Sequence, residues 1–163
     1  MVNLLNQIRL VVAEALLGND QIGDLVPDDP NDPEGVELAV YNARMNEITP
    51  VYPCVTYRIS QGLPDARFRS PAPLSSDEEP DESYKPRILD FYVEIEVWDQ
   101  APNADRIDQI AAVIDDWFES RAFVFTGGRV FRAEMLALLP DRYDKDLNAR
   151  FALMRYRLRV ARA

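Results

Sequence analysis

The chain has 163 residues, with 28 acidic side chains against 18 basic ones, a formal net charge of −10, a single cysteine and no histidine. This composition excludes histidine-based triads, histidine-ligated zinc or haem, an intrachain disulfide and any multi-cysteine metal site. The acidic balance argues against specific nucleic-acid binding, because phosphate neutralisation requires a basic surface. The length and a hydrophobic content of 47% predict one globular domain over residues 1–163.

The first half of the chain predicts one helix and two strands. Apolar residues recur at helical spacing over Val2–Leu17, and Gly18-Asn19-Asp20 ends the pattern. Three prolines exclude regular structure over Pro27–Gly35. Short strands are then expected at Leu38–Tyr41 and Pro53–Ser60. No apolar run is long enough to cross a membrane, and the first residues lack a signal-peptide pattern, so we expect no membrane association and a cytoplasmic site of synthesis and assembly.

Residues 61–86 differ in composition from the rest of the chain. They hold five prolines and the acidic run Asp77–Glu82. A polar segment of this length without regular structure is unusual inside a compact domain, so we predict a long protruding arm. A solvated loop is the alternative, and composition alone favours it slightly. If the segment is an arm, its apolar residues are candidate anchors for a neighbouring subunit or partner: Phe68, Leu74 and Tyr84.

The second half predicts a strand, a helix, a hairpin, a polar loop and a last strand. Strict alternation of apolar and polar residues identifies the two long strands, and Thr126-Gly127-Gly128 is a good hairpin turn. The order of elements predicts an α+β fold, with a mainly antiparallel sheet packed with two helices plus the arm. The expected ranges are Arg87–Asp99, Ala104–Phe118, Ala122–Phe125 with Arg129–Leu139, Asp141–Asn148 and Ala149–Ala163.

The sequence predicts no catalytic, cofactor-binding or metal-binding residues. The acidic stretch Asp28–Glu34 fails the calcium-loop pattern at both ends, and Thr126–Arg129 lacks the residues of a phosphate loop. Cys54 lies in an apolar strand, as a buried structural thiol does. Carboxylate pairs such as Asp115-Asp116 are too numerous to discriminate, and a small acidic enzyme that uses one such pair stays open as an alternative.

The most informative pattern is the charge on three strand faces. Acidic residues alternate along one strand and arginines along the last one, with one more arginine in an earlier strand. If these strands are neighbours, their polar faces form cross-strand ion pairs, with Arg157 opposite Glu94 and Glu96. Such a face is either solvated, with about 0 to 1 kcal/mol per pair, or packed on another subunit, and DNA binding is the third alternative. The residues concerned are Arg58, Glu94, Glu96, Arg155, Arg157 and Arg159.

Three strands have distinctive sequences: Tyr52–Tyr57 (YPCVTY), Phe91–Asp99 (FYVEIEVWD) and Arg155–Val160 (RYRLRV). The N-terminal helix and the arm flank the first strand, the helix 104–118 follows the second, and the hairpin precedes the third. This order of elements resembles the tail terminator (tail-completion) family of long-tailed phages and related particles. The resemblance runs from Val2 to Val160, and the segment 61–86 is longer than the family pattern requires.

The resemblance implies a non-enzymatic structural protein of the virion, located in the tail near the neck. Its members assemble as a hexameric ring on the last ring of tail tube subunits, stop tube polymerisation and meet the neck or head-completion protein. In contractile tails they also touch the sheath. DNA passes through the channel without specific binding. A neck or head-tail joining ring protein is the alternative within the same class.

Overall fold

The computed structural model describes residues 3–31, 37–62, 88–120 and 123–162. The helices within these residues are α1 (Leu4–Leu17), α2 (Asp20–Gly23), the short 3-10 helix η1 (Met45–Glu47) and α3 (Asp105–Ser120). The strands are β1 (Val40–Tyr41), β2 (Cys54–Gln61), β3 (Ile88–Asp99), β4 (Phe123–Phe125), β5 (Gly128–Asp144) and β6 (Ala149–Arg162).

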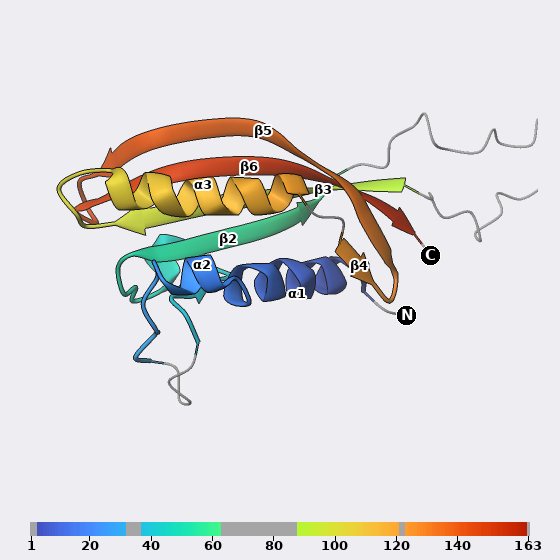
Figure 1. Cartoon of the computed structure of the whole chain (residues 1–163), viewed down its shortest axis with the longest axis horizontal. Helices are drawn as coiled ribbons and strands as arrows, with labels where there is room; N and C mark the ends of the chain where they lie inside the picture. The colour runs from blue at the N-terminus through green and yellow to red at the C-terminus, as the bar shows by residue number, and fades with distance from the viewer. Residues whose placement is uncertain (1–2, 32–36, 63–87, 121–122, 163) are drawn as a thin grey trace, which may run out of the picture.

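The strands form one sheet in the order β1-β2-β3-β6-β5-β4. The β1–β2 pair is parallel and every other pair is antiparallel. The helices α1 and α3 lie along the same face of the sheet (Figure 1). The predicted α+β class, with a mainly antiparallel sheet and two long helices on it, is confirmed.

Alternation along the central strands determines which face carries the core. On β3, Phe91, Val93 and Ile95 are fully buried toward the helices, while Glu94 between them points to the opposite face and is half-buried. On β6 the corresponding buried residues include Tyr156, whose ring stacks on Phe118 of α3 at 4.6 Å between ring centroids. The face away from the helices, here called the outer face, therefore carries the alternate polar residues.

The predicted hairpin is confirmed, with Phe125 paired to Gly128 and a two-residue turn between them. The turn lies against α1 (Figure 1), and a side chain at Gly127 would overlap the side-chain oxygen of Gln7. The overlap is with the end of a flexible side chain, so it is relieved when Gln7 turns away.

The end predicted for the hairpin's second strand was wrong. The strand β5 continues past Leu139 to Asp144, so the turn before β6 is shorter than the predicted loop Asp141–Asn148. The polar residues Asp141 and Arg142 are compatible with a strand here because this part of β5 lies at the sheet edge. Pro140 lies in a bulge of the β5–β6 ladder, where its missing N–H breaks no ladder hydrogen bond.

Two further predictions concern the arm and membrane-spanning segments. Most of the predicted arm, residues 63–86, lies outside the described residues, and with it lie the candidate anchors Phe68, Leu74 and Tyr84. Among the described residues, no helix has the length and apolar character needed to cross a bilayer.

Candidate interaction surfaces

The strands that carry the predicted charge pattern are neighbours in the sheet. The register places Glu94 of β3 between Arg58 of β2 and Arg155 of β6. One oxygen of Glu94 lies 2.9 Å from a guanidinium nitrogen of Arg155 and 3.9 Å from one of Arg58. The Glu94 side chain therefore joins three strands across the outer face.

Glu96 occupies the next outer-face position on β3. Its Oε1 lies 3.8 Å from Nη2 of Arg58. Its Oε2 accepts a hydrogen bond from the hydroxyl of Thr56 at 3.2 Å and another from the indole N–H of Trp98 at 3.1 Å. The ring of Trp98 in turn stacks on Phe151 with centroids 4.3 Å apart. These contacts fix the Glu96 carboxylate in one orientation.

The sequence placed Arg157 opposite Glu94 and Glu96, and this was wrong. Arg157 lies beside Tyr92 on β3, and its guanidinium forms a close ion pair with Glu134 of β5 on its other side. The hydrogen bond from Arg157 lowers the pKa of the Glu134 carboxyl. The alternation of apolar residues and arginines along β6 was predicted correctly. Alternation alone cannot give the register, because a shift of two residues keeps every side chain on the same face and pairs an arginine with a different carboxylate.

Arg159 faces Asp90, with Nε and Oδ1 3.4 Å apart. This is the most buried ion pair of the outer face, with side-chain exposures of 15% and 10%. Asp90 and Glu134 were not among the predicted site residues. Asp90 lies on the same polar face of the alternating strand as Glu94, so the alternation carried a signal for it, whereas Glu134 carried none.

These eight residues form what we call the outer-face network, with four arginines and four carboxylates. Its local charge is therefore balanced, although the whole chain carries −10. A balanced face avoids the like-charge repulsion that two acidic chains otherwise experience on close approach. The members are Arg58, Asp90, Glu94, Glu96, Glu134, Arg155, Arg157 and Arg159.

A second surface follows β5. β4 pairs only with Gly128–Val130, so among the described residues the stretch 131–144 has a strand neighbour, β6, on one side only. Bulges interrupt this stretch in three places. Large apolar side chains along it are exposed, which we call the β5 strip: Phe131, Leu136, Leu138, Leu139 and Tyr143. These five side chains concentrate exposed apolar surface on one strand instead of scattering it singly over the molecule.

A groove of about 260 Å³ lies between α3 and β5. Met135, Leu138 and Pro140 form its β5 side. On the helix side the carboxylates of Asp108 and Asp115 stand beside two alanines. The groove is therefore apolar with an acidic helix along one side. Its lining residues are Asp108, Ala111, Ala112, Asp115, Met135, Leu138, Pro140, Ala152 and Met154.

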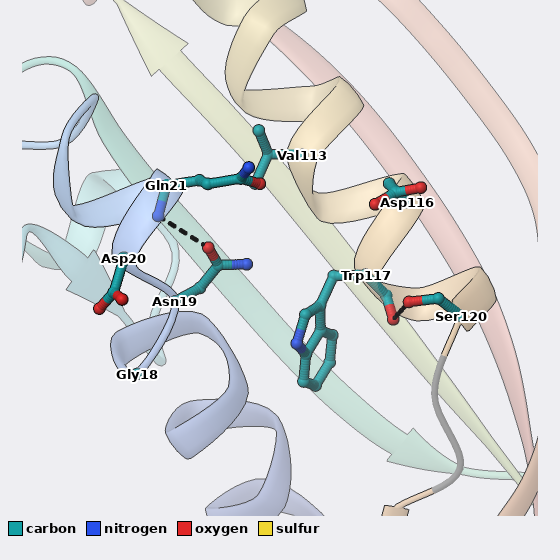
Figure 2. A pocket seen from close by; sticks show the side chains of 8 residues that line it. All are labelled: Gly18, Asn19, Asp20, Gln21, Val113, Asp116, Trp117 and Ser120. Atoms are coloured by element: carbon teal, nitrogen blue, oxygen red, sulfur yellow. Dashed lines mark hydrogen bonds between the residues drawn. The ribbon is translucent and has the colours of Figure 1, made fainter.

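A polar pocket of about 320 Å³ separates the start of α2 from α3, and Figure 2 shows Trp117 extending into it toward Asn19. The Asn19 side-chain oxygen accepts hydrogen bonds from the backbone N–H groups of Gln21 and Ile22. It therefore caps α2. The Ser120 hydroxyl donates to the carbonyl of Trp117. These polar groups serve the helix ends, which is a structural role.

Cys54 is buried, and burial raises the pKa of its thiol to about 12. A protonated, buried thiol is a poor nucleophile, as the sequence interpretation expected. Within the described part of the chain, no cluster of three or more cysteine or acidic residues is placed to hold a metal ion.

No protein-family model matches the chain, and no curated protein matches it. Among solved structures, one similar chain comes from a structure described as the virion of a native gene transfer agent (GTA) particle. The two chains are 20% identical over 76% of this chain and 78% of that one, with a TM-score of 0.46.

Proposed function

We propose that this chain is a structural protein of a phage or phage-like virion, and specifically a tail terminator. In this role it forms a hexameric ring on the end of the tail tube, stops tube polymerisation and presents a surface to the neck or head-completion protein. The tail sheath is a further neighbour in a contractile tail. The protein acts by binding other proteins and requires no catalytic residues or cofactor.

The observation that carries this proposal is the β5 strip. Leu136, Leu138 and Leu139 are each between 39% and 47% exposed within four consecutive positions. In water such a strip favours association with another protein surface, because burial of apolar area is worth roughly 25 cal/mol per Å². A subunit of an assembly buries this area against its neighbours.

The arrangement of elements supports the same proposal. The resemblance to tail terminators rests on a helix, two strands, a second helix, a hairpin and an arginine-alternating last strand. The order α1, β2, β3, α3, β4–β5 and β6 has this form. The outer-face network adds a charge-balanced surface for protein contact, and the net charge of −10 suits a channel through which DNA slides without binding.

Deleting the gene in its parent phage tests the proposal. Loss of a terminator leaves tube polymerisation unchecked, so we expect tails of uncontrolled length in electron micrographs. Tails of normal length that are not attached to heads would instead identify a neck protein and overturn the terminator role. Unchanged, infectious particles would overturn both. Re-supplying the gene from a plasmid restores normal particles if the deletion acts through this protein alone.

Native mass spectrometry of the purified chain tests the ring. We expect a hexamer at high protein concentration or on isolated tail tubes. A chain that stays monomeric in both conditions would contradict the proposed assembly.

A further inference from the structure

We propose that the groove between α3 and β5 receives the β4–β5 hairpin of a second copy of this chain. This contact rests on the proposed function, because it joins adjacent subunits of the proposed ring. It adds the two surfaces that meet and the residues that pair across them.

The hairpin has the shape and charge of a partner for the groove. Phe123 and Val130 face the core and are buried, whereas Val124 is 80% exposed. The register places Arg129 directly beside Val124 on the same outward face. The tip therefore presents an apolar side chain and a guanidinium together. In the segment 121–133 there are three arginines and no acidic residue.

The groove is complementary to this hairpin in both respects. Leu138 and Met135 supply apolar surface on one side, and Leu138 is 47% exposed. The adjacent helix α3 holds five acidic residues and one arginine. Asp115 already accepts a hydrogen bond from Tyr156, whereas Asp108 is exposed and makes no ion pair with another described residue. Likewise, Arg129 makes no ion pair within the described ranges. Asp108 is thus the carboxylate we assign to Arg129 of the second copy.

The two surfaces are different parts of the chain, so the contact is head-to-tail. The hairpin lies beside the amino end of α1, whereas α3 and the later part of β5, which line the groove, lie farther from α1 (Figure 1). A head-to-tail contact leaves one groove and one hairpin free after each addition, and it closes into a ring when the rotation between copies permits. Attraction between a basic hairpin and an acidic helix also offsets the general repulsion between two chains of net charge −10.

Charge reversal tests the contact, measured by native mass spectrometry and sedimentation velocity. Arg129→Glu and Asp108→Lys each place like charges at every interface, so we expect each variant alone to lose the ring. In an equal mixture of the two variants, alternating copies restore opposite charges at every contact, and we expect the ring to return. Lys145→Glu and Asp146→Lys, in the exposed turn before β6, are matched controls that leave the ring intact.

The outcomes separate this contact from the function. If the wild-type chain forms a ring and both reversals keep it, the contact is overturned while the terminator proposal stands. A wild-type chain that never associates, alone or on tail tubes, overturns both. If a charge reversal alters the thermal unfolding midpoint, the variants Leu138→Asp and Val124→Asp are tested in place of the charge reversals. Loss of the ring in both of these variants supports the contact, and retention of the ring in both overturns it.

Discussion

The hydroxyl of Tyr156 donates a 2.9 Å hydrogen bond to the carboxylate of Asp115, which ties the middle strand β6 to the helix α3 across the core. Burial, and then the hydrogen bond and charge of Asp115, raise the pKa of Tyr156 far above its usual value. The tyrosine hydroxyl therefore stays protonated and donates this bond at every pH at which the protein is studied.

Removing this hydroxyl should destabilise the fold without disturbing its packing. For Tyr156→Phe we expect a loss of about 1 to 2 kcal/mol in the free energy of unfolding, since the bond is made to a charged acceptor and its partner carboxylate is only half-buried. Urea denaturation followed by circular dichroism measures it. Tyr143→Phe is the matched control, because Tyr143 is exposed and its hydroxyl bonds Asn148 at the surface. Equal losses in the two variants would contradict the role assigned to the buried bond.

Stability should fall in alkali because of Cys54. The folded thiol has a pKa of about 12, against 9.0 for a free thiol. Below about pH 9 the thiol is protonated in both the folded and the unfolded chain, and its contribution to stability is complete. Above pH 9 the thiol of the unfolded chain loses its proton first, so unfolding becomes easier as the pH rises toward 12. We expect the urea midpoint to decline between pH 9 and 10.5, and to decline less steeply in Cys54→Val. Identical slopes in the two proteins would refute this assignment.

Two carboxylates of the outer-face network should differ in their effect on stability. The Asp90 side chain is 10% exposed beside Arg159, whereas the Glu94 side chain is 29% exposed. Removing one charge of a buried pair is costly because the other stays in a poorly solvated place, so we expect about 2 to 4 kcal/mol for Asp90→Asn. For the more exposed pairs of Glu94 we expect about 1 kcal/mol or less for Glu94→Gln. Chemical denaturation at low and high salt tests both; a larger effect at Glu94 would reverse the ranking.

The end of β3 is joined to the start of α3 by Asp99. Its side chain is 3% exposed, lies 2.9 Å from Nε of Arg106 and accepts a hydrogen bond from the backbone of Ala101. We expect Asp99→Ala to lower the free energy of unfolding by about 1 to 2 kcal/mol, because it removes the hydrogen bond from Ala101 and the ion pair to Arg106, whose side chain is 47% exposed and stays solvated. Asp105→Ala, on the exposed first turn of the same helix, controls for general effects on α3. Hydrogen exchange of the α3 amides should accelerate in the Asp99 variant alone.

Strands β3 and β6 were predictable because each is long and alternates strictly, and a half-buried sheet face imposes that alternation directly on the sequence. The hairpin at Thr126–Gly127 was predictable for a similar reason, since its turn chemistry is local. The partner of Arg157 was not predictable, because the β3–β6 register joins segments far apart in the chain and bulges shift the β5–β6 register. Glu134 lies 23 residues from Arg157 in the chain and beside it in the sheet.

The extent of β5 could not be read from the sequence either. Pro140 and Asp141 carry a turn signal, and Asp141 does adopt a positive φ of 42°. Pairing with Ala149 and Arg150 nevertheless holds Tyr143 and Asp144 in the strand. The exposed apolar residues of β5 were assigned to an ordinary strand, because alternation does not reveal that α3 leaves this side of the sheet uncovered.

The place of β6 in the sheet has a consequence for how the chain folds. It is the last described strand in the sequence, yet it lies between β3 and β5 at the centre of the sheet. Its pairs with β3 join residues as distant as Ile88 and Ala161. The sheet therefore stays in two halves until residues 149–162 have left the ribosome, and closing such distant contacts is slow. During synthesis, β3 and β5 therefore each have an open edge at which β6 later pairs.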